Sequence, residues 1–251
     1  MLQRIKKALL FVLLLLPIAA VGGYFAGIYG WEGLTEEMKA MVLEQIPDVT
    51  LYCMITMIQT ISYAAIFGFF GYFLAEKIGL MGPISLKKVG LVPTGIWAVI
   101  SGGVLSLDRL LFGKQIPQVA ALYESKPSVS NWIASVLYGG VIEEVMIRLF
   151  FMSLIVFLVW KLLYVKREEI PKGAFVFANI MASLLFAAGH IPATIQMFGE
   201  LTPLILFRCF LLNGMAGLGF GYLYRKHGIQ YAMLGHMGAH IVWKLLWVIF
   251  M

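Results

Sequence analysis

The feature that most constrains the fold is a series of apolar runs, each about as long as a helix that crosses a lipid bilayer. Such a helix needs about 20 predominantly apolar residues. The runs are separated by short stretches that contain charged residues, proline or glycine. They cover residues 8–30, 51–75, 89–107, 131–164, 173–190, 203–224 and 229–250. The sequence therefore predicts an all-α polytopic membrane helical bundle of seven or eight transmembrane helices.

Composition agrees with a membrane protein. Hydrophobic residues make up 61% of the chain and charged residues only 13%, whereas soluble domains carry roughly 25% charge. At 251 residues, the predicted spans leave little room for anything else. We therefore expect residues 1–251 to form a single membrane domain without a separate soluble module.

The net charge of +6 comes from basic residues that lie between the apolar runs. This distribution is typical of topology signals and argues against a nucleic-acid partner, because lysine and arginine mark the cytoplasmic loops of membrane proteins. If the seven runs alternate in direction, one side of the membrane receives most of these residues, and it includes the N-terminus. We predict an integral cell-membrane protein with that side cytoplasmic. The residues are Arg4, Lys6, Lys7, Lys77, Lys87, Lys88, Lys161, Lys166, Arg167, Lys172, Arg225 and Lys226.

The first apolar run can be read as an anchor helix or as a cleaved secretory signal. Basic residues precede it, as they do in a signal peptide. The uncharged stretch nevertheless extends from Ala8 to Gly30, beyond the apolar region of about 7–15 residues in a signal. We expect an uncleaved anchor and keep the cleaved signal as the alternative.

The run at 131–164 is too long for one simple span. A straight α-helix of that length would reach roughly 50 Å, against a hydrocarbon core of about 30 Å. The helix must therefore tilt, project from the membrane or break. We expect a break near Arg148 or Gly140.

Three ionisable residues, Glu143, Glu144 and Arg148, lie inside this same run. Each costs about 2.5–3.5 kcal/mol at the centre of a membrane helix, so such residues indicate a functional site. In a helix, Glu144 and Arg148 share a face and can form an ion pair. Glu143 points about 100° away. The sequence therefore predicts a structural ion pair beside a glutamate that is free for another task.

Three of the four histidines also lie on predicted membrane helices. His190 follows Phe186 by one helical turn, and His236 and His240 are one turn apart in the last run. His227 lies in a basic loop and is expected to be solvated. Three imidazoles together with an unpaired carboxylate favour a hydrolytic or metal site over three separate packing roles.

The order of these residues resembles the motifs of a known family, the CAAX prenyl protease and bacteriocin-processing intramembrane endopeptidases. The resemblance covers residues from about 131 to 251, which we expect to form the protease core behind the N-terminal helices at 1–130. One position departs from the family, whose last motif usually ends in Asn or Asp where this chain has histidine. The motifs are Glu143-Glu144-x-x-x-Arg148, Phe186-x-x-x-His190 and His236-x-x-x-His240.

The resemblance implies that Glu143 and His190 activate a water molecule for attack on a peptide carbonyl. It also implies that His236 and His240 stabilise the oxyanion. This chemistry is physically reasonable, because a carboxylate shielded from water suits general-base work and an imidazole can donate to a negative oxygen. The substrate would be a peptide or membrane-anchored protein, such as a prenylated chain or a peptide precursor, met within the lipid bilayer.

Supporting roles follow from the same resemblance. Glu144 and Arg148 would position the base, and Phe186 belongs to the motif that carries His190. A zinc ion is an open alternative, because two histidines one turn apart, a third histidine and a carboxylate can bind zinc. The metal ligands would then be His190, His236, His240 and Glu143.

One geometric difficulty accompanies this assignment. If every run is a straight span, His190 lies near the outer end of its helix and His236 near the inner end of its own. Either the 175–198 segment is shifted along its helix so that His190 lies at mid-membrane, or the helices are short and broken around a water-filled cavity.

Two other classes of protein also place ionisable residues in the membrane. A proton- or ion-coupled transporter would predict an internal repeat with matching interrupted helices, and the sequence contains no such symmetry. A non-enzymatic bacteriocin-immunity protein would tolerate the loss of Glu143. We therefore favour the intramembrane endopeptidase and keep both alternatives.

Overall fold

The computed structural model describes residues 1–250, and none of them lies in a strand. The predicted all-α fold is therefore confirmed. Seven helical segments within these residues are long and apolar enough to cross a membrane. They are Leu2–Glu32, Val49–Lys77, Lys88–Phe112, Val129–Leu163, Lys172–Phe198, Pro203–His227 and Ile229–Phe250.

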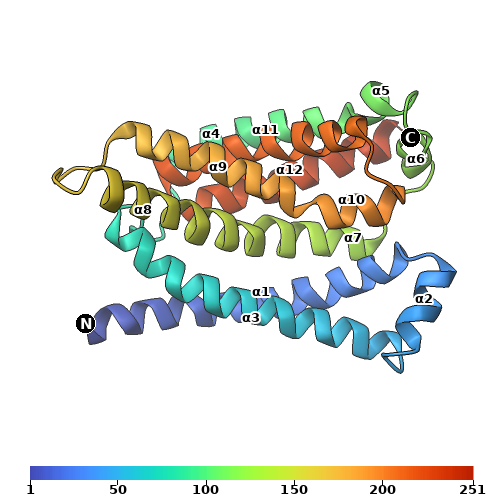
Figure 1. Cartoon of the computed structure of the whole chain (residues 1–251), viewed down its shortest axis with the longest axis horizontal. Helices are drawn as coiled ribbons and strands as arrows, with labels where there is room; N and C mark the ends of the chain where they lie inside the picture. The colour runs from blue at the N-terminus through green and yellow to red at the C-terminus, as the bar shows by residue number, and fades with distance from the viewer. Residues whose placement is uncertain (251) are drawn as a thin grey trace.

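The first two long helices form an antiparallel pair. Helices α1 (Leu2–Glu32) and α3 (Val49–Lys77) run side by side along one flank of the bundle, joined by the short α2 (Glu36–Leu43) (Figure 1). Their backbones approach closely where small residues meet, since a Cβ on Gly27 would lie 2.8 Å from the Cα of Cys53. Small residues permit such close helix contacts in membranes.

Polar side chains cap the starts of α2 and α3. The Thr35 hydroxyl accepts a hydrogen bond from the Met38 backbone N–H at the start of α2 (3.2 Å). The Asp48 carboxylate accepts one from the Leu51 N–H at the start of α3 (2.9 Å). These N-caps satisfy backbone donors that the first helical turn leaves unpaired.

The fourth span is one continuous helix, and the break expected near Gly140 or Arg148 is not found. The middle of this helix consists of π-helical turns instead, and both residues lie within them. A π turn includes one more residue than an α turn but keeps the backbone hydrogen-bonded, which an open break in hydrocarbon would not. The parts are α7 (Val129–Ala134), η1 (Ser135–Glu143), η2 (Val145–Met152) and α8 (Ser153–Leu163).

The π-helical part packs against the N-terminal pair through fully buried apolar side chains that include Val145, Leu149 and Met152. A Cβ on Gly71 of α3 would lie 3.0 Å from the Leu149 side chain. Because lipid tails are as apolar as these residues, close packing rather than water exclusion holds the helices together.

The remaining helices pack on the other side of this long helix (Figure 1). The short α5 and α6 lie at the end of the bundle where the chain terminates, between the apolar runs predicted at 89–107 and 131–164. The elements are α4 (Lys88–Ser106), α5 (Asp108–Phe112), α6 (Pro117–Leu122), α9 (Lys172–Gly189), α10 (Ile191–Phe198), α11 (Pro203–His227) and α12 (Ile229–Phe250).

The fifth span bends at His190, between α9 and α10. Residues 191–198, which follow the apolar run predicted at 173–190, are also helical. Pro192 has no backbone N–H to continue the hydrogen bonds of α9, and it stands in the first turn of α10, where none is needed. Gly199 then ends α10 with a positive φ of 76°. His190 thus lies inside a 27-residue span rather than at its outer end.

Candidate active site

The predicted ion pair between Glu144 and Arg148 is confirmed. Arg148 Nη1 lies 3.0 Å from Glu144 Oε1, and both side chains are fully buried. The guanidinium also donates from Nη2 to the Gly217 carbonyl (3.0 Å) and stacks over the Phe186 ring at 4.6 Å. A carboxylate, a carbonyl and an aromatic face thus share the buried positive charge, which hydrocarbon alone would not stabilise.

Glycine at position 217 makes room for this arginine. A Cβ on Gly217 would lie 2.9 Å from Arg148 Nη2. A Cβ on Gly221 would clash with the amide of Asn179, a residue of α9. The small residues of α11 therefore admit polar side chains from neighbouring helices as well as allowing close backbone contact.

His236 is bound to the same carboxylate. Its Nδ1 lies 2.9 Å from Glu144 Oε1, and its ring stacks on Phe220 at 4.5 Å with an 18° angle between the planes. When Glu144 is ionised it can only accept a hydrogen bond, so Nδ1 carries the proton and donates. The Nε2 atom of His236 is then left for another partner. Glu144 thus orients a histidine in addition to pairing with Arg148.

His190 and His236 contact opposite parts of one aromatic ring. Phe186 packs edge to face against His190 at 4.7 Å and against His236 at 5.6 Å. The expected separation between the two histidines is therefore not found, because the span continues past His190 to Phe198, in agreement with the first alternative. His190 Nδ1 lies 2.8 Å from the Phe186 carbonyl oxygen. A carbonyl only accepts, so Nδ1 donates and the neutral ring presents an unprotonated Nε2.

Glu143 and His240 lie against the same glycine. A Cβ on Gly139 would be 2.9 Å from His240 Nε2 and 3.8 Å from Glu143 Oε2. Glu143 is half-buried and takes part in none of the ion pairs formed by residues 1–250. Its neighbour Glu144, by contrast, contacts both Arg148 and His236 through Oε1. Of the two glutamates in this run, Glu143 is therefore the one without an ion-pair partner among residues 1–250.

The four candidate zinc ligands do not fit a preformed metal site. Within residues 1–250, no three His, Cys, Asp or Glu side chains lie close enough together to hold an ion. The His236 and His240 rings stack face to face at 4.8 Å with a 23° angle between the planes. A tetrahedral zinc ion needs donors that converge on one point. His236 Nδ1 is also engaged with Glu144.

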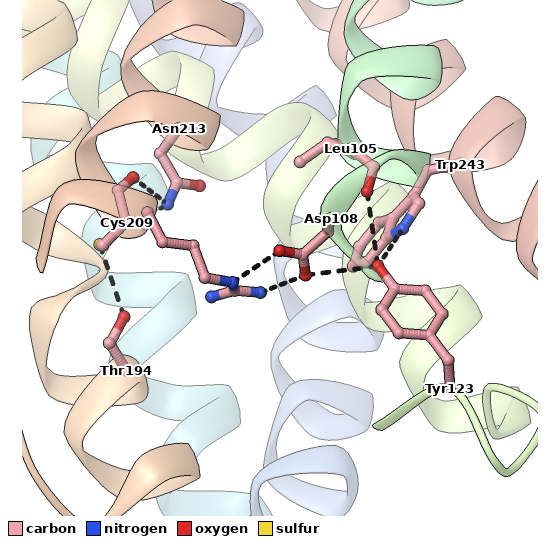
Figure 2. Close-up of polar contacts among 8 residues, drawn as sticks. Leu105, Asp108, Tyr123, Thr194, Cys209, Asn213 and Trp243 are labelled. Carbon is pink, nitrogen blue, oxygen red and sulfur yellow. Dashed lines mark hydrogen bonds and ion pairs between the residues drawn. The ribbon is translucent and has the colours of Figure 1, made fainter. Parts of the chain in front are cut away.

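Sequence reasoning missed two cations inside the bundle, one fully buried and one partly buried. Lys244 is fully buried on α12 and donates from Nζ to Ser135 Oγ (2.7 Å). Arg208 of α11 pairs with the buried Asp108, with 2.7 Å between Nε and Oδ1 (Figure 2). Each is a charge inside an apolar run, the same signal that identified the residues around Glu143.

A cluster formed by Asp108, Arg208, Tyr123 and Trp243 joins α5 and α11 to α12. Asp108 pairs with Arg208 and accepts a hydrogen bond from the hydroxyl of Tyr123, and Figure 2 shows that this hydroxyl also accepts one from the Trp243 indole (3.2 Å). Burial and the Asp108 carboxylate both raise the pKa of Tyr123, so its phenol stays neutral and keeps its proton. The cluster therefore holds Trp243, which lies one turn or less from His240 and Lys244.

Comparison with known proteins supports the predicted family resemblance. Residues 125–242 match the family model described as type II CAAX prenyl endopeptidase Rce1-like, and this segment includes every motif residue from Glu143 to His240. Searches of curated proteins and of solved structures found no match. The predicted family is thus confirmed, and it is a family of proteases. Over residues 125–242, the chain is similar to the Rce1-like type II CAAX prenyl endopeptidases.

Proposed function

We propose that the chain is an intramembrane endopeptidase in which Glu143 activates the attacking water. The observation that carries the proposal is the contrast between two adjacent glutamates. Glu144 is fully buried and neutralised by Arg148, whereas Glu143 is half-buried, has no ion-pair partner among residues 1–250 and lies beside His240 at Gly139. An unpaired carboxylate shielded from bulk water is suited to accept a proton from water.

In the proposed reaction, Glu143 and His190 both bind and activate the attacking water molecule. Glu143 takes one proton as the water oxygen bonds to the peptide carbonyl carbon, and His190 accepts a hydrogen bond from the same water through Nε2. The bond between His190 Nδ1 and the Phe186 carbonyl supports this role, because it fixes the tautomer. When the C–N bond breaks, Glu143 returns the proton to the leaving amine. The products are a carboxylic acid and an amine.

The two histidines of α12 stabilise the oxyanion. In its protonated form, His236 donates from Nδ1 to Glu144 and from Nε2 to the developing negative oxygen. His240 is the second donor, and its Nε2 lies beside the glycine that Glu143 also contacts. In this proposal Glu144 and Arg148 act on His236 as well as holding the helix that carries the base.

The membrane arrangement and the substrate belong to the same proposal. We place the N-terminus in the cytoplasm, on the evidence of the basic loops. Residues 131–251 form the protease core and residues 1–130 supply helices that support it, since α1 and α3 pack against η1 and η2. The substrate is a membrane-associated chain, prenylated at its C-terminus or cleaved from a peptide precursor. We expect α1 to be a retained anchor.

The test is a cleavage assay with purified protein in liposomes. The substrates are a peptide library that includes prenylated CAAX peptides, and the solvent is water enriched in the heavy oxygen isotope. We expect new peptide C-termini that carry the isotope, detected by mass spectrometry. A transporter would instead accumulate peptide inside the vesicles uncut, and an immunity protein would leave the library unchanged.

Substitution of Gly139 tests the contact between the base and His240. In Gly139→Ala the new Cβ would lie 2.9 Å from His240 Nε2 and force the imidazole away. We expect cleavage to fall about 10²-fold, as for the loss of one oxyanion donor. Gly95→Ala is the matched control, because a Cβ there meets nothing within 4 Å. Equal activity of the two variants would show that His240 does not need its place beside Gly139.

Replacement of His240 by the residue typical of the family separates a donor from a metal ligand. We expect His240→Asn to retain substantial activity, because an amide N–H can donate to the oxyanion, and His240→Ala to lose about 10²–10³-fold. We also expect a chelator to leave wild-type turnover unchanged. One tightly bound zinc per chain, lost together with activity on chelation and restored by zinc, would overturn the donor role.

A further inference from the structure

Three side chains on one face of α12 contact residues 135–144 of the fourth span. On α12, His236, His240 and Lys244 follow one another at intervals of four residues and so share a face. The first meets Glu144 at 2.9 Å, and the second lies against Gly139. The third meets Ser135 at 2.7 Å. The two segments thus run antiparallel. Lys244 makes the contact nearest the C-terminal end of α12, in the same packing that brings His236 to Glu144 and His240 to Gly139.

Lys244 has no acidic partner to explain its burial. It is fully buried, yet it takes part in none of the ion pairs formed by residues 1–250. Its ammonium group contacts a neutral hydroxyl and the faces of Trp243 at 4.8 Å and Trp132 at 6.0 Å. An apolar residue of similar length would pack at this position without desolvating a charge. A buried charge that lowers the stability of the fold in this way indicates a functional role.

The contact with Ser135 is itself held in place. The Ser135 hydroxyl donates to the Asn131 carbonyl oxygen (2.6 Å), so the oxygen is oriented to accept from Lys244. On the other side, the indole of Trp243 is fixed by its hydrogen bond to Tyr123 (Figure 2). The ammonium group therefore joins α12 to the first turn of η1 at a point where neither side is free to slide.

We infer that Lys244 is a positioning residue of the proposed active site, whose bond to Ser135 fixes α12 against η1 and holds His240 beside Gly139 and Glu143. This inference rests on the proposed function. Lys244 lies four residues beyond His240, about 6 Å along the helix axis, and does not touch the reacting atoms in this role. It also lies just past the segment that matches the family model, which ends at residue 242.

The experiment compares Lys244→Met, Ser135→Ala and the double variant with wild type in the liposome cleavage assay. Methionine keeps an unbranched apolar chain but removes the ammonium group. We expect Lys244→Met to melt at or above the wild-type temperature while kcat falls about tenfold or more and KM changes less than twofold. Ser135→Ala leaves the ammonium group without its acceptor, so we expect a lower melting temperature as well as a lower kcat. The double variant should regain the melting temperature of Lys244→Met but not the activity.

A purely structural lysine would give a different result. In that case Lys244→Met would melt earlier and lose activity only in proportion to the folded protein lost. Wild-type kcat in a stable Lys244→Met protein would also overturn the inference. Glu143→Gln, assayed in parallel, separates this failure from that of the proposed function. If wild type shows no cleavage that depends on Glu143, the proposed function fails and the role of Lys244 falls with it.

Discussion

Glu143→Gln is expected to reduce peptide cleavage by about 10²–10⁴-fold, the range that a general base contributes. Glutamine has nearly the same shape as glutamate but cannot take a proton from water. Glu143 forms no ion pair with residues 1–250, so its substitution leaves no charge unpaired. We therefore expect the variant to insert, fold and melt like wild type. The measurement is kcat/KM in liposomes, together with the melting temperature of the purified protein.

The matched control is the same substitution at an exposed position. Glu200 lies in the turn between α10 and α11 and is exposed, so Glu200→Gln should leave both cleavage and melting unchanged. If Glu143→Gln turns over substrate as fast as this control does, Glu143 is not the base. The endopeptidase assignment would then need another residue to activate water.

The parts of this structure that depend on local sequence could be predicted. A run of about 20 apolar residues has few alternatives to a membrane helix, so the spans were identified from their length and composition. The ion pair of Glu144 and Arg148 followed equally directly, because residues four apart on a helix must share a face. The three histidine and glutamate motifs were predicted from their order along the chain.

The parts that depend on contacts between distant segments could not be predicted. Nothing near Glu144 indicates that its carboxylate also binds His236, 92 residues later. The pairs Asp108 with Arg208 and Ser135 with Lys244 are separated by 100 and 109 residues and have no periodic signal. The π-helical turns were missed for another reason, since their sequence is as apolar and as helix-compatible as that of the α turns around them.

The polar residues inside the bundle fall into two groups. One group stabilises the helix packing, and the other contains the proposed catalytic residues. Arg148 is fully enclosed by Glu144, the Gly217 carbonyl and the rings of Phe186 and Phe220. Glu143, one residue from this cluster, has no ion-pair partner in the described chain. A membrane helix can carry a reactive carboxylate at depth when neighbouring charges are satisfied and its backbone stays hydrogen-bonded through π turns.

Arg148→Ala tests the stabilising role of the buried ion pair with Glu144. We expect this variant to be destabilised by about 3–5 kcal/mol, the usual effect of breaking a buried pair by removing one partner. Alanine would leave the Glu144 carboxylate buried without a cation, leave the Gly217 carbonyl without its donor and open a space between Phe186 and Phe220. The free energy of unfolding is measured in mixed micelles.

Arg4→Ala is the control for this substitution, because Arg4 pairs with Glu76 at 3.5 Å on the surface, where its side chain is 65% exposed. An exposed pair contributes less than about 1 kcal/mol, so this variant should unfold nearly as wild type does. The difference between the two substitutions measures what burial adds to an ion pair in this fold. Similar stabilities for both variants would mean that Glu144 finds another partner, such as a protonated His236, when Arg148 is lost. Glu144 and His236 would then be able to hold the site without the arginine.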